Sequence, residues 1–76
     1  MRQYMPYIKT RRGTFNNMRP LESMEAALAK YEEWAREYLI TSAWVEVRDP
    51  DEPWYFRKWK VKLVGVLKRE VSDVDI

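Results

Sequence analysis

The strongest hydrophobic pattern in the chain is helical and covers about residues 24–39. Because an α-helix has about 3.6 residues per turn, side chains spaced three, four and seven positions apart share one face. Seven side chains follow this spacing: Met24, Ala27, Leu28, Tyr31, Trp34, Ala35 and Tyr38. Ser23 is a suitable N-cap, and Glu25 lies in the first turn, where the helix dipole favours an anion. We therefore expect one amphipathic helix here.

Two later segments alternate apolar and polar residues with a period of two, which is typical of half-buried strands. In the first, Ala43, Val45 and Val47 point to one side, and Trp44, Glu46 and Arg48 to the other. In the second, the two sides hold Trp59, Val61 and Leu63 against Lys58, Lys60 and Lys62. The intervening DPDEP contains two prolines and three acids and predicts a turn. The two segments therefore read as an antiparallel hairpin.

The register of this hairpin follows from matching its apolar faces, because a slip of one residue would turn every side chain to the other side. The expected cross-strand pairs are Ala43–Val61, Trp44–Lys60, Val45–Trp59, Glu46–Lys58 and Arg48–Phe56. The alternation is lost at Gly65, where we expect a bulge or a bend.

The N-terminal segment has a weaker strand pattern. Pro6 favours an edge strand or a bulged one, because proline has no N–H to give to a ladder. Gly13 suits a turn with positive φ, so residues 7–9 and 14–16 are expected to form a small hairpin. The resulting order, β-β-α-β-β, predicts an α+β fold with one helix packed on one face of a small antiparallel sheet. If the N-terminal hairpin does not form, three strands remain.

Chain length and composition indicate one small domain over residues 1–76, with residues 70–76 expected to be a frayed acidic tail. The sequence contains no cysteine and no histidine. These absences remove thiolate chemistry, the usual general base and the common ligands of zinc, iron–sulfur and haem sites. The acids of DPDEP match no calcium-loop spacing, and prolines already explain them as turn residues. We expect neither catalysis nor a cofactor.

The apolar runs are too short to cross a bilayer, and the first residues are polar where a signal peptide would be apolar. Cytoplasmic residence without membrane contact is therefore the expectation. The net charge is only +2, but the charges are unevenly distributed. Residues 1–21 and 55–69 are basic and contain no acid, whereas the segments between and after them are acidic. The basic residues of these segments are therefore the candidates for contact with an anionic partner.

The three alternating lysines could bind nucleic acid. Alternate residues on a strand lie about 6.6 Å apart, close to the spacing of phosphates along one nucleic-acid strand. Trp44, Trp54 and Phe56 would supply the surfaces on which bases stack. Further anion contacts would come from Lys9, Arg11, Arg12 and Lys62. The simpler interpretation is a solvated strand face on which lysine discourages aggregation.

The tryptophans suggest a protein contact instead. Trp34 and Trp59 lie on predicted core faces, whereas Trp44 and Trp54 lie on the side opposite the helix. Exposed aromatic residues near arginine are typical of binding hot spots. The predicted partner-binding set is Trp44, Trp54, Phe56, Arg48, Arg57, Lys58 and Lys60. We favour a non-catalytic protein-binding module, with homodimerisation through the same face as a close variant and nucleic-acid binding as the alternative.

The size, the lack of cysteine and the plan of one helix on a sheet loosely resemble the short accessory proteins that phages make to inhibit host or defence enzymes. No motif carries this resemblance, and it assigns no residue a role. It implies that the partner is a larger host or defence protein, which the module would occlude.

Overall fold

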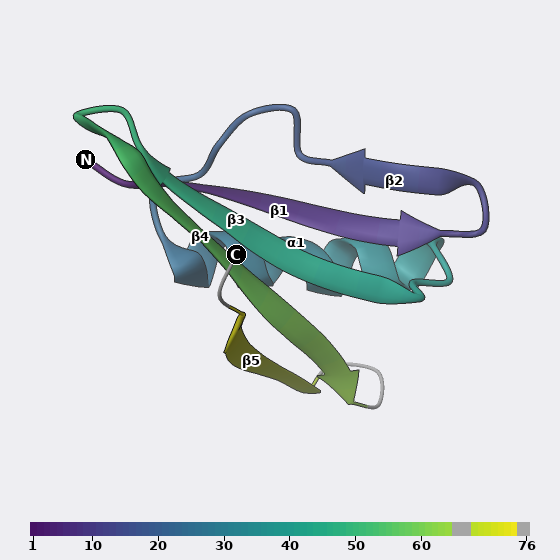
Figure 1. Cartoon of the computed structure of the whole chain (residues 1–76). Helices are drawn as coiled ribbons and strands as arrows, with labels where there is room; N and C mark the ends of the chain where they lie inside the picture. Colours follow the sequence, from purple (N-terminus) through teal and green to yellow (C-terminus); the bar gives the residue numbers. More distant parts are fainter. Residues whose placement is uncertain (65–67, 75–76) are drawn as a thin grey trace.

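The computed structural model describes residues 1–64 and 68–74 of the chain. Its elements are β1 (Gln3–Thr10), β2 (Gly13–Asn16), α1 (Met24–Glu37), β3 (Ser42–Asp49), β4 (Glu52–Val64) and β5 (Lys68–Val74) (Figure 1). The strands pair antiparallel in the order β2-β1-β3-β4-β5. The predicted α+β class and the order β-β-α-β-β are confirmed. β5 extends this sheet: the backbone of Lys68–Val74 pairs with β4, where a frayed tail had been expected from residue 70.

The helix starts where the sequence predicts and ends two residues earlier than expected. The Ser23 hydroxyl accepts a hydrogen bond from Ala26 N–H at 3.1 Å, as an N-cap should. Tyr38 already has extended backbone angles, φ −125° and ψ 144°, and caps the last turn by donating to Trp34 O at 2.8 Å. The following residues lead directly into β3, with Thr41 N–H donating to Lys9 O. Entry into the sheet therefore sets the end of the helix.

The core lies between α1 and the adjoining face of β1, β3 and β4. The alternation of β3 places Ala43, Val45 and Val47 on this side, all buried. Among the residues whose side chains the structure describes, the buried cluster is Ile8, Ala27, Tyr31, Ala43, Val45, Val47 and Val61. The side of the sheet facing away from α1 is called the open face below.

The predicted register of β3 with β4 is confirmed at each of the five pairs. Beyond Arg48–Phe56 the next pair is Asp49–Glu52, so residues 53–55 of β4 have no counterpart on β3. The turn between the strands is thus tight, and the irregularity lies entirely on the β4 side. The bulge expected at Gly65 falls outside the described residues.

The N-terminal hairpin forms as predicted, with Tyr7–Asn16 and Lys9–Thr14 among its pairs. Pro6 is nevertheless in an interior strand, since β1 lies between β2 and β3. Tyr4 exchanges hydrogen bonds with Leu21 on the side of β1 away from β3. Residues two apart direct their backbone polar groups to the same side, so the nitrogen of Pro6 also faces away from β3. β2 pairs only with residues from Tyr7 onwards, and the proline therefore interrupts neither ladder.

Tyr31 attaches the helix to the two central strands. Its side chain is buried, and its hydroxyl donates to the backbone oxygens of Trp44 at 2.6 Å and of Tyr7 at 3.3 Å. Its ring also packs edge-on against Trp34, with 5.7 Å between centroids. Burial raises the pKa of the Tyr31 hydroxyl well above its ordinary value, so this group stays protonated and remains a donor.

We predict that Tyr31→Phe lowers the free energy of unfolding by about 1–2 kcal/mol, because the hydrogen bonds of a buried hydroxyl to two backbone carbonyls are lost. Tyr31→Ala should cost about 3–5 kcal/mol through the cavity it opens. Urea denaturation measures both changes. The control is Tyr38→Phe, at a partly exposed tyrosine that follows the helix, which should shift stability by less than about 0.5 kcal/mol. Equal effects of the two Phe substitutions would contradict this role of Tyr31.

Candidate functional site

The open face carries three rows of side chains that run across the strands. The register sets Asn16, Tyr7, Trp44 and Lys60 in one row, Met5, Glu46 and Lys58 in the next, and Gln3, Arg48 and Phe56 in the third. Most of the predicted partner-binding residues are thus brought together on one side of the sheet. Basic side chains flank an aromatic centre, as the alternation in the sequence implied.

Trp44 stands at the centre of this face and is held on both sides. Its ring stacks on Tyr7 with 5.3 Å between centroids and 3° between planes. Lys58 Nζ lies 4.8 Å from the ring centroid, and the indole N–H donates to Glu46 Oε2 at 3.2 Å. Since β1 and β4 flank β3 on opposite sides, Tyr7 and Lys58 cover opposite faces of the indole. Trp44 is therefore a rigid, half-buried part of the surface.

Glu46 partly neutralises the basic surface. Its carboxylate accepts from the Trp44 indole and lies 3.3 Å from Arg48 Nη2. The Arg48 guanidinium also lies 5.0 Å from the centroid of the Phe56 ring. Acid, indole, guanidinium and phenyl ring thus form one connected group, in which the charged side chains orient the aromatic ones.

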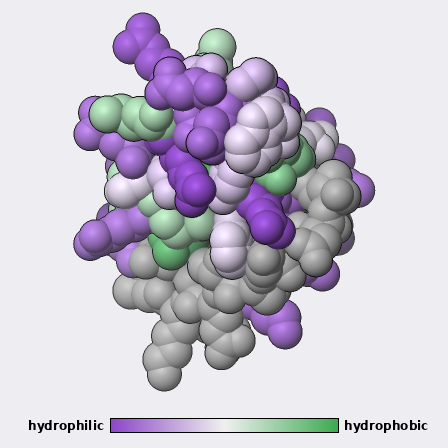
Figure 2. Space-filling view, turned by 60° about the vertical axis from the view of Figure 1, so that its left-hand side comes forward, coloured by the Kyte–Doolittle hydropathy of each residue, from purple (hydrophilic) through white to green (hydrophobic). Residues whose placement is uncertain are grey.

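Trp54 lies in the stretch of β4 that has no β3 counterpart, and its side chain is 77% exposed. Nothing else in the described part of the chain leaves so large a ring in water. Figure 2 brings forward the end of the molecule that holds the N-terminus and the β3–β4 turn; hydrophilic side chains dominate it, and strongly apolar ones form small separate areas. An exposed indole on such a surface is an unsatisfied apolar group.

Two sets of predicted residues lie elsewhere. Lys9 belongs to the open face, but Arg11 and Arg12 form the β1–β2 turn, at the end of β1 that is remote from Trp54 (Figure 1). Arg57, predicted for the basic rim, is not on the open face: it is paired with the buried Val47 and therefore lies on the helix side. Arg57 directly follows Phe56 in the chain, and alternation along a strand therefore directs its side chain to the opposite side of the sheet.

Sequence reasoning missed Tyr7, which covers one face of Trp44. The pairing of β1 with β3 joins segments separated by the whole helix, and no local pattern specifies it. A signal did exist, because Tyr7 and Lys9 alternate with Pro6 and Ile8 in the manner of a half-buried strand.

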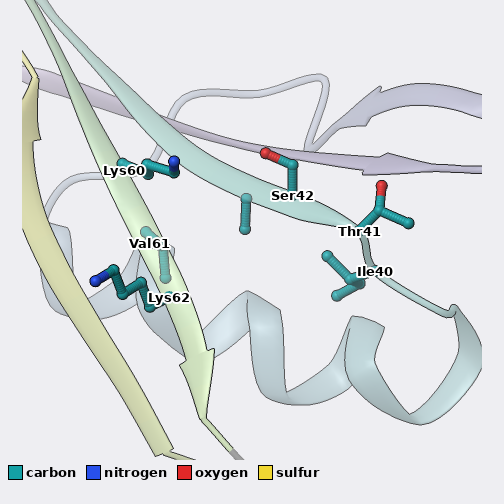
Figure 3. Close-up of a pocket in the computed structure, with 7 residues that line it drawn as sticks. Ile40, Thr41, Ser42, Lys60, Val61 and Lys62 are labelled. Atoms are coloured by element: carbon teal, nitrogen blue, oxygen red, sulfur yellow. The ribbon is translucent and has the colours of Figure 1, made fainter.

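A depression of about 460 Å³ lies where the start of β3 and the later part of β4 meet the chain that leaves the helix (Figure 3). Ile40, Val61 and Lys62 line it together with Thr41, Ser42, Ala43 and Lys60. Ile40 and Val61 point to the helix side, whereas Ser42 points to the opposite side. Among the lining residues that the structure describes, Lys60 and Lys62 supply ammonium groups, Thr41 and Ser42 supply hydroxyls, and the remaining surface is aliphatic.

Within the residues that the structure describes, no group of acidic side chains is arranged to hold a metal ion. No helix in the described ranges is long and apolar enough to span a bilayer. No protein-family model matches the chain, and comparisons with curated proteins and with solved structures find no match. Fold and surface thus define a small α+β protein with a helix on one side of an antiparallel sheet and an aromatic, basic surface on the other.

The different environments of Trp44 and Trp54 give a measurable difference. We predict that Trp54→Phe removes most of the tryptophan emission that acrylamide quenches readily, because a collisional quencher reaches an exposed ring first. Trp44→Phe should change quenching only slightly, since Tyr7 and Lys58 shield that ring. Stern–Volmer measurements on both variants test this. Loss of the quenchable emission in Trp44→Phe would show that the indole stack is open.

Proposed function

We propose that this protein is a non-catalytic binding module that attaches to a larger protein through its open face and through Trp54 beside the β3–β4 turn, with Trp54 as the anchor. The exposure of Trp54 carries the proposal. The buried core does not include the Trp54 ring, so the stability of the fold does not explain why a tryptophan is exposed at this position. Tryptophan is among the residues that dominate binding energy at protein interfaces when a partner's pocket encloses it.

The aromatic and basic residues of the open face support the same function. Tyr7, Trp44 and Phe56 are already held in place by stacking and by cation–π contacts, so little side-chain freedom would be lost on binding. Lys58 and Lys60 border them and favour a partner with an acidic surface, which they would steer into encounter. A module of this kind acts by occlusion, and we extend the proposal to inhibition of a larger host or defence protein.

The test begins by capturing partners on immobilised protein from an extract of the cells in which it acts. The binding constant of each captured protein is then measured by calorimetry. Trp54→Ala should weaken binding by about 30-fold or more, equivalent to about 2 kcal/mol for a buried aromatic anchor. Met18→Ala, which shortens an equally exposed apolar side chain in the loop before the helix, is the matched control and should change the affinity less than about twofold.

A partner that binds wild type and Trp54→Ala equally would contradict the proposed anchor. Raising the salt concentration should weaken the contact only gently if burial of aromatic surface dominates it. Circular dichroism of both variants provides the folding control, since neither side chain belongs to the buried core.

Nucleic-acid binding is the second candidate, favoured by the lysines that share the open face with the Tyr7–Trp44 stack. Lys60 is directly opposite Trp44, and Lys9 follows Tyr7 on the same side of β1. The occupied faces of Trp44 weigh against it, because base stacking needs a free ring face. Glu46 at the centre of the face also repels phosphate.

This candidate predicts a steep dependence on salt. A single-stranded oligonucleotide bound through several lysines should lose roughly 10-fold or more in affinity between about 50 and 200 mM salt. Replacing Lys58, Lys60 and Lys62 by Gln should abolish the gel shift while the protein stays folded. If the oligonucleotide does not bind at low salt, the candidate is rejected; if it binds equally to the triple variant, the lysine face is not the site.

A further inference from the structure

A second exposed apolar surface lies at the end of the helix, away from Trp54. Phe15 of β2 stacks on Tyr38 with 5.9 Å between ring centroids, and each is 41% exposed. Leu39, the next residue, is 74% exposed. This group exists because the helix ends at Glu37, which leaves Tyr38 and Leu39 outside it. Like Trp54, these side chains contribute nothing to the buried cluster.

Two arginines accompany this surface. A depression of about 270 Å³ is lined by Arg11, Arg12, Tyr38 and Leu39, together with Thr10 and Glu37. The turn that carries the arginines is held by Arg12 N–H, which donates to Thr10 Oγ1 at 3.1 Å. Glu37 is the single acid against two guanidinium groups, so the depression is basic. The hairpin–helix patch is defined as Arg11, Arg12, Phe15, Tyr38 and Leu39.

The opposite end of the molecule has the complementary chemistry. The β3–β4 turn carries Asp49, Asp51 and Glu52, and Trp54 follows two residues later. Asp49 Oδ1 accepts from Asp51 N–H at 2.9 Å, which makes the turn compact and holds the pKa of Asp49 below its ordinary value. The acidic tip is defined as Asp49, Asp51, Glu52 and Trp54.

Part of this negative charge is already paired. The Met1 ammonium lies 2.8 Å from Asp51 and 3.4 Å from Asp49. The ammonium and the Asp51 carboxylate are both highly exposed, so their pair is weak and the Asp51 carboxylate can still reach a partner's guanidinium. The acidic tip therefore presents an indole beside accessible carboxylates.

From these two ends we infer that the protein self-associates head to tail, with the acidic tip of one copy seated on the hairpin–helix patch of the next. The inference rests on the role of Trp54 as an anchor in the proposed function. Trp54 would pack against Tyr38 and Leu39, while Asp51 and Glu52 face Arg11 and Arg12. The hairpin–helix patch is suited to an acidic segment with an aromatic side chain, and the acidic tip of a second copy is such a segment.

The positions of the two ends set the form of the assembly. The acidic tip lies beside the start of β1, where Gln3 pairs with Arg48, and the patch lies at its other end, where Thr10 pairs with Gly13 (Figure 1). Because the two surfaces lie at opposite ends of β1, each added copy leaves one free tip and one free patch, and we expect the assembly to grow in a line and not to close into a ring. Apposition of two open faces is disfavoured, because both are basic.

Because the contact joins a tip of four residues to a patch of five, we expect it to bury less than the roughly 1,200 Å² at which specific interfaces begin, and to have a dissociation constant between about 10 µM and 1 mM. Sedimentation of the wild type up to about 1 mM should show a mass that rises continuously past that of a dimer. Trp54→Ala and the double variant Arg11→Glu with Arg12→Glu should each remain monomeric, because one lacks the anchor and the other lacks the basic patch.

Mixing the two variants provides the decisive test. ¹⁵N-labelled Trp54→Ala protein keeps its patch, and the unlabelled double variant keeps its tip, so one contact can form. Amide shifts should appear at Arg11, Arg12, Phe15, Tyr38 and Leu39, with saturation at one added copy. Unlabelled Trp54→Ala protein, which has no anchor to offer, is the control and should cause no shifts. Unlabelled protein with Asp51→Arg and Glu52→Arg should shift the amides of residues 11, 12, 15, 38 and 39 in the labelled double variant, because both charges are exchanged at that contact.

Three results would overturn the inference: no shifts in the mixture at about 1 mM, shifts centred on Tyr7, Trp44 and Lys60, or a wild-type dimer that neither variant disrupts. The proposed function is tested separately by the binding of a different protein. If the protein is a monomer that binds such a partner through Trp54, only the self-association is wrong. If the protein self-associates but its captured partner binds Trp54→Ala as tightly as wild type, the proposed contact with a different protein is wrong and the head-to-tail contact stands.

Discussion

The structure depends on the phenol of Tyr31, which reaches from the helix to the backbone of the two central strands. Its hydroxyl contacts the carbonyl oxygens of Trp44 and Tyr7, the same two residues whose rings stack on the opposite side of the sheet. The helix and the aromatic centre of the open face are thus attached to one pair of residues. Any displacement of the helix would act on the backbone that positions those rings.

This arrangement divides the aromatic residues into two kinds. Tyr7, Trp44 and Phe56 are held by neighbouring side chains and give the open face its shape. Trp54, Tyr38 and Leu39 are more exposed, because they lie where regular structure is interrupted: a stretch of β4 without a β3 counterpart, and the residues after the helix. The exposed apolar groups on which both proposals rest therefore occur at the ends of elements.

Much of the fold could be predicted because its patterns are local. Alternation along the two strands specified their register at each of five pairs, since a slip would have placed Glu46 in the core. The N-cap and the first turn of the helix followed from Ser23 and Glu25. The strand β5 was not predicted, because the acidic composition of the last residues indicated a frayed tail. The end of the helix was placed two residues too late, because its apolar stripe continues to Tyr38, where the chain already turns toward the sheet.

The sequence alone determined which face of each strand is apolar, that Trp44 and Trp54 lie outside the core, and that cysteine and histidine chemistry is absent. Only the tertiary structure decided which residues meet: that Tyr7 covers Trp44, that Arg57 faces the helix side, and that Arg11 and Arg12 join Tyr38 and Leu39. The physical reason is the distance along the chain between the residues that determine each feature. Side-chain direction follows from neighbours in the chain, whereas the pairing of β1 with β3 joins segments that a whole helix separates.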